Sequence, residues 1–291
     1  MADSPNIDSL IKLLDDPDEN IFVHIRNEIM LMGPDVIPNL EEVWEEGSLG
    51  LLFQTRIEEI IHDIQFNSVK KELNDWQKND SENLLRGVYL IAKYQYPELE
   101  FEEIDKTINQ ITQDIWIELN ENLTALEKTR IINHIVFDVY GFTGNTSNYH
   151  APQNSYINNV LESKKGNPIS LSILFIVIGD KLGLPIEGIN LPRHFITGWV
   201  DDFFFPHITD EPTLLFYINP FSKGTVFSQK DIEYFLKQIN IEAQESFFKP
   251  CDNIAIMNRV LNNLIRSYSQ QGYAEKVDEL MILQRVINPE S

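Results

Sequence analysis

The chain has 291 residues, of which 43% are hydrophobic and 23% are charged, a composition typical of a globular protein with a sizeable core. Its formal net charge is −22, because 45 acidic residues outnumber 23 basic ones. So acidic a chain repels phosphate backbones and anionic lipid surfaces, which argues against nucleic acid and membrane as direct partners. We expect the partner to be a protein or a peptide.

The cysteine content and the N-terminus bear on the compartment. Cys251 is the single cysteine, so an intramolecular disulfide and a cysteine-rich zinc site are excluded. The opening MADSPNIDSL lacks the basic and apolar segments of a secretory signal, and the apolar run 171–178 is too short to cross a bilayer. We therefore expect a cytoplasmic protein without a cofactor.

One pair of residues has metal-ligand spacing. His134 and Asp138 stand at i and i+4 of a predicted helix, but no ligand motif surrounds them. The preferred interpretation is a hydrogen-bonded pair, and we expect no metal site.

Residues 1–80 are predicted to form a helical region. Apolar residues recur at helical spacing in four segments, which are separated by breakers at 15–17, 33–34 and 47. The helix sizes and the phrase LLDDPDENI loosely resemble HEAT repeats, although a plain helical cap explains the pattern equally well. The polar stretch 74–82 is the predicted boundary.

Residues 81–250 are predicted to form the core domain. Helical patterns over 83–96, 101–115 and 125–139 precede a loop at 141–153. A further helix at 228–239 follows the predicted strands of this domain, and residues 251–291 read as a helix pair that resembles a single tetratricopeptide unit.

The stretch 154–199 contains the element around which the core is organised. From Pro168 to Leu182 the chain is apolar on nearly every side, with Asn167 placed to cap a helix and Gly183 placed to end it. A helix that is apolar all round is buried. Short β-type runs follow at 186–190 and 195–200, and others at 203–205, 214–218 and 225–227, which predicts an α+β fold with a small antiparallel sheet.

Three phrases carry a family resemblance: GFTGNTSNYHAPQNSYINNVLESKKGNPISLSILF, LGLPIEGINLPRHF and YINPFSKG. In this order, and followed by the helix pair, they resemble the bacterial SirB-type family, which has a transglutaminase-like (papain-like) core. The resemblance implies a buried helix against a small antiparallel sheet, flanked by the N-terminal helices and the C-terminal pair. Residues 1–80 lie outside it.

The resemblance also implies a catalytic arrangement that this chain lacks in part. A cysteine begins the buried helix in the superfamily, a histidine follows on a strand, and an aspartate or asparagine orients the histidine. The equivalent positions here hold Pro168, His194 and Asn219. Proline has no nucleophilic atom, so the acyl-enzyme route needs a donor from elsewhere.

We therefore expect a non-catalytic transglutaminase-like protein that acts as a protein- or peptide-binding or regulatory module. The alternative is an acyl-transfer enzyme or an amide or ester hydrolase that uses Ser170 with His194 and Asn219. A third interpretation is structural, with His194 a satisfied core residue. The candidate binding residues are Asn154, Tyr156, Asn167, Arg193 and Trp199, which offer amides, a cation and aromatic rings around the helix and its following strand.

Overall fold

A computed structural model describes residues 7–45, 50–200 and 213–289. The chain divides into two compact units, residues 1–72 and 73–291, and the boundary falls inside helix α4 (Leu51–Asn79). The sequence predicts the boundary in the polar stretch 74–82, because turn-forming residues are frequent there. In the structure, α4 continues through this stretch as far as Asn79. The reason lies in its apolar stripe, since Leu73 and Trp76 are buried at helical spacing and the Trp76 indole donates to the Asn83 carbonyl at 2.9 Å.

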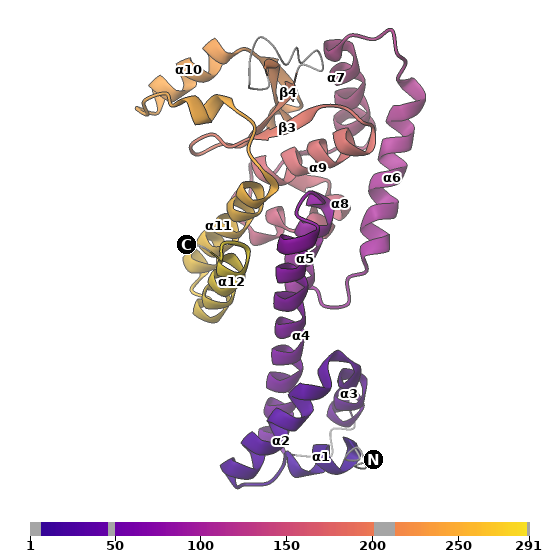
Figure 1. The fold of residues 1–291 in the computed structure, drawn as a ribbon, viewed down its shortest axis with the longest axis vertical. Helices are drawn as coiled ribbons and strands as arrows, with labels where there is room; N and C mark the ends of the chain where they lie inside the picture. Colours follow the sequence, from indigo (N-terminus) through magenta and orange to yellow (C-terminus); the bar gives the residue numbers. More distant parts are fainter. Residues whose placement is uncertain (1–6, 46–49, 201–212, 290–291) are drawn as a thin grey trace. The chain divides into compact units, whose positions relative to one another are not determined.

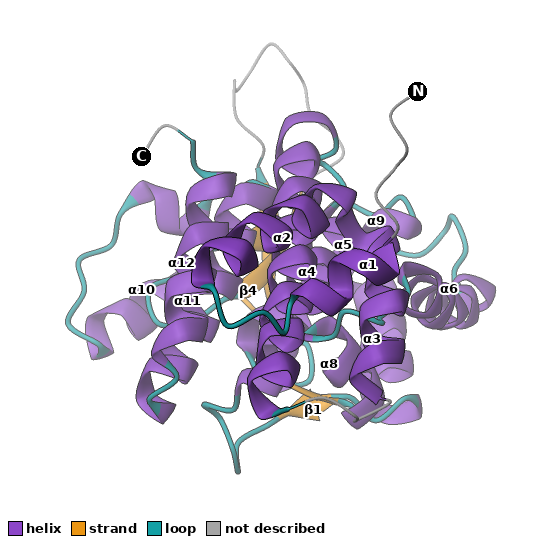
Figure 2. Cartoon of the chain, turned by 90° about the horizontal axis from the view of Figure 1, so that it is seen from below, coloured by secondary structure: helices purple, strands orange, loops and turns teal. Residues whose placement is uncertain are grey.

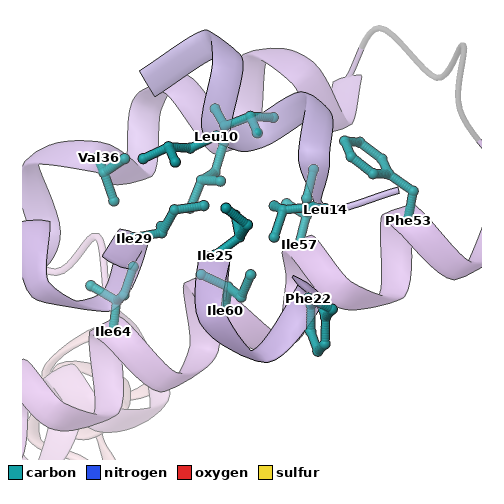
Figure 3. Close-up of a cluster of buried hydrophobic side chains, with 12 residues drawn as sticks. Leu10, Leu14, Phe22, Ile25, Ile29, Val36, Phe53, Ile57, Ile60 and Ile64 are labelled. Carbon is teal, nitrogen blue, oxygen red and sulfur yellow. The ribbon is translucent and has the colours of Figure 1, made fainter. Parts of the chain in front are cut away.

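The first unit has a hydrophobic core of its own, drawn in Figure 3. Its elements are α1 (Ile7–Leu13), α2 (Glu19–Met32), the 3-10 turn η1 (Gly33–Val36), α3 (Ile37–Glu45) and the first part of α4. Leu14, Ile29, Leu40, Ile57 and Ile60 are fully buried there. These positions belong to the four predicted apolar stripes.

The second unit is mostly helical, and the strands contribute only a few short segments (Figures 1 and 2). Its helices are α5 (Leu84–Gln95), α6 (Phe101–Glu118), α7 (Ala125–Asn133) with the π-helical turn η2 (His134–Val139), α8 (Ile157–Ser163), α9 (Pro168–Lys181), α10 (Gln229–Gln238), α11 (Asn253–Gln271) and α12 (Ala274–Ile287). The shorter 3-10 turns are η3 (Pro152–Ser155), η4 (Pro220–Ser222) and η5 (Glu245–Phe248).

The main sheet is antiparallel, with strand order β3 (Ile186–Ile189), β4 (Ile196–Val200), β5 (Leu214–Asn219) and β6 (Thr225–Phe227). A second, parallel pair joins β1 (Thr143–Gly144) to β2 (Lys165–Gly166). These strands with the surrounding helices confirm the expected α+β class. The predicted run 203–205 lies outside the described residues.

Helix α9 is the central element of the second unit (Figure 1). Its residues are buried from Pro168 to Gly179, and it contacts β3, β4, α5, α6, α8 and α11. The predicted ends are also observed: Asn167 forms the N-cap, and Gly183 has φ of +65°, the left-handed conformation that glycine adopts without strain. Since contacts surround it on all sides, no polar face is needed.

The C-terminal helices α11 and α12 pack against each other, and the left-handed Gly272 caps α11. Tyrosines attach α11 to the rest of the unit, because Tyr268 Oη lies 3.1 Å from Tyr156 Oη and 3.0 Å from Gln95 Oε1. The first of these contacts joins residues 112 positions apart in sequence. The helix pair is therefore fixed to the core that contains α9.

Candidate functional site

The N-terminal end of α9 lies beside the loop that precedes α8. The short parallel pairing of Thr143–Gly144 with Lys165–Gly166 brings this loop to the start of α9. Two backbone hydrogen bonds extend the ladder, from Thr143 N to Lys164 O and from Asn145 N to Gly166 O, each 2.8 Å. The loop is thereby held where its later residues can reach the site.

Asparagines brace that loop. Asn145 Nδ2 donates to Asn154 Oδ1 at 2.8 Å, and Asn154 Nδ2 donates to the carbonyls of Asn148 and Tyr149 at 2.7 and 3.1 Å. Asn154, a predicted binding residue, is buried and uses both ends of its amide in this way. Its observed contribution is to shape the loop.

Helix α9 begins with a closed hydrogen-bonded cap. Asn167 Oδ1 accepts from Ser170 N, Ser170 Oγ accepts from Asn167 N, both at 3.0 Å, and Asn167 Nδ2 donates to Ser155 Oγ at 2.8 Å. Ser170 is only 2% exposed, and its hydroxyl also lies 3.2 Å from the Asn167 carbonyl. The candidate nucleophile Ser170 is thus occupied by the cap. It is not among the residues that line the cavity beside His194.

His194 lies just before β4, with its ring between two aromatic rings. The ring centroids of Phe221 and Phe235 are 6.4 and 6.3 Å from that of His194. Phe221 in turn packs flat on Gly144, where an added Cβ would approach the Phe221 ring to 2.6 Å. A glycine is required at position 144 so that this wall of the site can close.

Asn219 ends β5 beside His194, as the family pattern implies. The pairing of Thr197 with Ile218 places the end of β5 next to the start of β4. Asn219 Nδ2 donates to Ser222 Oγ at 3.2 Å, whereas Asn219 Oδ1 is buried and accepts no well-aligned hydrogen bond from the described residues. The free oxygen is therefore the acceptor available to a histidine N–H.

The surroundings of His194 favour the neutral ring. Burial lowers the pKa of His194 below its usual value, the interaction with the Asn219 amide partly opposes this, and the positive charge of Arg259 adds to the lowering. Because Asn219 Oδ1 meets no donor in good geometry among the described residues, the His194 and Asn219 side chains are close but imperfectly aligned. A neutral histidine with an orienting amide is what a general base requires, whether or not a nucleophile is present.

A cavity of about 570 Å³ opens beside this histidine, within the size range of ligand pockets. Its lining comes from the loop, the start of α9, the turn before β4 and one face of α11: Tyr149, His150, Ala151, Asn167, Pro168, Ile169, Arg193, His194, Phe195, Arg259, Asn263, Arg266 and Ser267. The cavity therefore brings together Pro168, His194, Asn167 and Arg193 of the predicted residues. Ser170, Asn154, Tyr156, Trp199 and Asn219 do not line it.

Two predicted binding residues, Tyr156 and Trp199, are buried in the core and do not line the cavity. Tyr156 is 1% exposed and contacts Tyr268, so it joins α8 to α11. Trp199 is 3% exposed on β4, with its ring centroid 6.0 Å from that of Phe216. Both side chains contribute to core packing, because a large aromatic ring buries much apolar surface.

Arg193 occupies an unusual backbone conformation. Its φ is +61°, and the His194 N–H donates to the Leu191 carbonyl at 3.3 Å across the turn 191–194. Glycine or asparagine is the usual residue at a left-handed turn position, and other residues are uncommon there. In this chain the position holds an arginine, and that arginine lines the cavity.

The remaining candidates lie away from this cavity. Cys251 lines a separate cavity of about 770 Å³, and burial raises the pKa of its thiol to about 12, so it is not a reactive thiolate. His134 Nδ1 lies 3.3 Å from Asp138 Oδ2 on an exposed turn. Across residues 7–45, 50–200 and 213–289, no cluster of three or more potential ligands forms around a metal position.

The sequence analysis did not predict that residues of α11 line the cavity. Arg259, Asn263 and Arg266 follow one another at i, i+4 and i+7, which places them on one face of the helix toward the cavity. This polar stripe on an otherwise amphipathic helix is the signal by which the sequence marks them. The interpretation of residues 251–291 as a tetratricopeptide-like helix pair assigned no site residue to this helix.

The fold and the site define a class of protein. The family model described as "Transglutaminase-like superfamily" matches residues 102–262, more than half of the chain. The chain belongs to the transglutaminase-like superfamily. In its described residues, no helix has the length and apolar character that crossing a membrane requires.

Similar proteins carry two kinds of name. The chain is 28% identical over 193 residues to a UPF0162 protein of Xylella fastidiosa, a match that covers 64% of this chain and 65% of that protein. It is 26% identical over 159 residues to a UPF0162 protein of Vibrio cholerae, covering 54% of each. Over 284 residues it is 26% identical to F-box only protein 21 of the mouse, covering 87% of this chain and 43% of that protein. The chain thus spans less than two thirds of the length of each of these relatives. No solved structure matches the chain.

Proposed function

We propose that this protein is a non-catalytic member of the superfamily that binds a peptide segment of a partner protein in the cavity beside His194. The observation that carries the proposal is Pro168 at the first position of α9, lining the cavity where the superfamily resemblance implies the nucleophile. Without a nucleophilic atom there, no covalent intermediate forms with a bound amide. The histidine and the cavity are retained.

The cavity chemistry supports a peptide ligand. Asn263 supplies an amide group that can pair with peptide backbone, and the exposed Tyr149 supplies aromatic surface. Most of the lining residues are polar or charged, so the cavity suits a ligand such as a peptide that presents hydrogen-bonding groups.

The hydrolase alternative receives less support from the geometry. Ser170 would have to give up its hydrogen bonds in the α9 cap before it could attack a substrate, and Ser172 Oγ is buried and lies 3.4 Å from the Phe195 carbonyl. We favour the binding role because neither serine is free beside His194.

We also propose that the chain belongs to the SirB type within the superfamily, that α11 and α12 form a tetratricopeptide-like pair, and that the protein works in the cytoplasm. The order of the three sequence phrases supports the first proposal, and the antiparallel helix pair supports the second.

The test is an affinity selection that also detects turnover. The full chain is incubated with a mixture of tetrapeptides, half with a free C-terminus and half amidated, and retained peptides are identified by mass spectrometry after size exclusion. Ala151→Trp fills the cavity, whereas Ala274→Trp introduces the same ring at an exposed position at the start of α12. We expect retention to fall roughly tenfold or more in the first variant and to stay unchanged in the second.

The retained peptides should remain uncut and undeamidated over hours. Turnover that is lost in His194→Ala would contradict a non-catalytic role. Retention that is equal in both tryptophan variants would contradict binding at this cavity.

A further inference from the structure

The charge of the cavity is opposite to that of the chain. Three arginines, Arg193, Arg259 and Arg266, line it together with His150 and His194. The whole chain has 45 acidic residues against 23 basic ones, yet no described Asp or Glu lines this cavity. The positive charge of this cavity therefore does not follow from the composition of the chain.

The larger cavity of the same unit shows the contrast. That cavity, about 770 Å³ in volume, has six carboxylates in its lining against one lysine: Asp80, Glu82, Asp105, Asp180, Glu187, Asp252 and Lys181. Two separate cavities in one unit thus have linings of opposite charge. The arginines are a property of the cavity beside His194 rather than of the surface in general.

Among the described residues, the guanidinium groups of this cavity have no carboxylate partner. In the part of the chain that the structure describes, no ion pair forms to Arg193, Arg259 or Arg266. Arg259 is half-buried, and within the described ranges its side chain makes one hydrogen bond, the 3.3 Å contact of Nη1 with Asn190 Oδ1. A half-buried guanidinium without a counter-charge favours an anionic ligand, because guanidinium groups pair bidentately with carboxylates and phosphates.

We propose that this cavity binds the carboxylate of a peptide, with Arg259 and Arg266 of α11 and Arg193 of the turn before β4 as its cationic partners. The partial positive charge at the N-terminal end of α9, whose first residue Pro168 lines the cavity, adds to the same attraction. The inference rests on the proposed function, since it names the chemical group that the bound peptide presents.

The net charge of the chain selects a carboxylate over a phosphate. A field from −22 charges repels any anion at long range, and the repulsion grows with the charge of the ligand. A peptide carboxylate carries one negative charge, whereas a phosphate group carries close to two at neutral pH. The amide of Asn263 also suits a ligand that continues as a peptide backbone.

The experiment compares two probes that differ only in charge, N-acetylglycylglycine and its C-terminal amide. The full chain, labelled with ¹³C in the histidine rings, is titrated with each probe at constant ionic strength, and the His194 signal is assigned with His194→Gln. We expect the acid to shift the His194 signal along a saturable curve and the amide to leave it in place. Inorganic phosphate, titrated in the same way, should bind more weakly than the acid.

Matched arginine variants locate the site. Arg259→Gln should weaken binding of the acid about tenfold, and the exposed Arg266→Gln, which is the safer variant for folding, about threefold to fivefold. Arg285→Gln, on the exposed side of α12, should leave binding unchanged. Equal shifts by acid and amide, or an unchanged affinity in both cavity variants, would overturn the proposal. Tighter binding of phosphate would overturn the choice of a carboxylate.

The outcomes separate this inference from the proposed function. If selected peptides bind as well when amidated, the peptide role survives and the carboxylate site fails. If the acid probe binds through the arginines but the library yields no retained peptide, the carboxylate site survives and the peptide role fails.

Discussion

The pKa of His194 is set by opposing interactions, and single side chains contribute to each of them. The Asn219 amide favours the protonated ring, and burial together with Arg259 disfavours it. These influences come from the end of β5 and from α11, so each can be removed separately. The pKa of His194 therefore depends on the positions of both Asn219 and Arg259.

The pKa of His194 should move in opposite directions in two variants. Asn219→Ala removes the acceptor and should lower the pKa further, whereas Arg259→Gln removes the nearby charge and should raise it. Both are measured from the ring carbon-bound proton signals in an NMR pH titration. Shifts of the same sign in both variants would contradict the assigned roles.

The same lowered pKa has a consequence for stability. The unfolded chain binds the proton more tightly than the folded one, so neutral His194 contributes stability that is present above about pH 6.5, its ordinary pKa, and is lost as the pH falls through the lowered folded value. His194→Gln should flatten this part of the stability curve.

At the scale of elements, the first turn of α9 connects several segments. Its cap joins Asn167 to Ser170 within the helix and to Ser155 in η3. The cavity wall formed by Pro168 and Ile169 depends on this turn. Asn83, which caps α5 by accepting from Arg86 N at 3.0 Å, is a comparable residue with fewer side-chain partners.

Asn167→Ala should cost about 2 kcal/mol of unfolding free energy, because it removes the cap and leaves buried Ser155 without its partner. Asn83→Ala should cost about 1 kcal/mol, the usual loss for an N-cap. Urea unfolding followed by tryptophan fluorescence in a Trp44→Phe background measures this, since the other three tryptophans, Trp76, Trp116 and Trp199, belong to the second unit. Equal losses would show that the Ser155 contact contributes nothing.

At the scale of the whole molecule, the charge of −22 disfavours the folded state, whereas the local charge of the arginine cavity favours the binding of an anion. Self-repulsion among acidic residues destabilises the folded chain, and the arginine cavity attracts anions against that background. Salt screens both, because the screening length is about 10 Å at 0.1 M.

Raising sodium chloride from about 0.02 to about 0.2 M should therefore raise the melting temperature by roughly 2 °C, equivalent to about 1 kcal/mol at this chain length. The same change should weaken binding of N-acetylglycylglycine. Differential scanning calorimetry and the NMR titration give the two results. A melting temperature that falls with salt would mean that favourable ion pairs outweigh the net repulsion.

Much of the fold follows from local pattern. The buried helix α9 with its caps, the switch to strands after Pro185, and the C-terminal helices were all predicted, because helical and strand periodicity and capping residues act within a few positions of each other. The polar stretch 74–82 is the exception: buried Leu73 and Trp76 hold it helical to Asn79, and only the packing shows this.

The sequence by itself determined that a proline stands at the head of the buried helix and that His194 and Asn219 follow in the superfamily order, since these are matters of residue identity and spacing. Only the tertiary structure decided which side chains share the cavity. Ser170 and Asn154 are engaged in caps and loop bracing, Tyr156 joins two helices, and α11 supplies Arg259 and Arg266 from the far end of the chain. The physical reason is that a polar side chain has several possible hydrogen-bond partners in sequence, and the packing of distant segments selects among them.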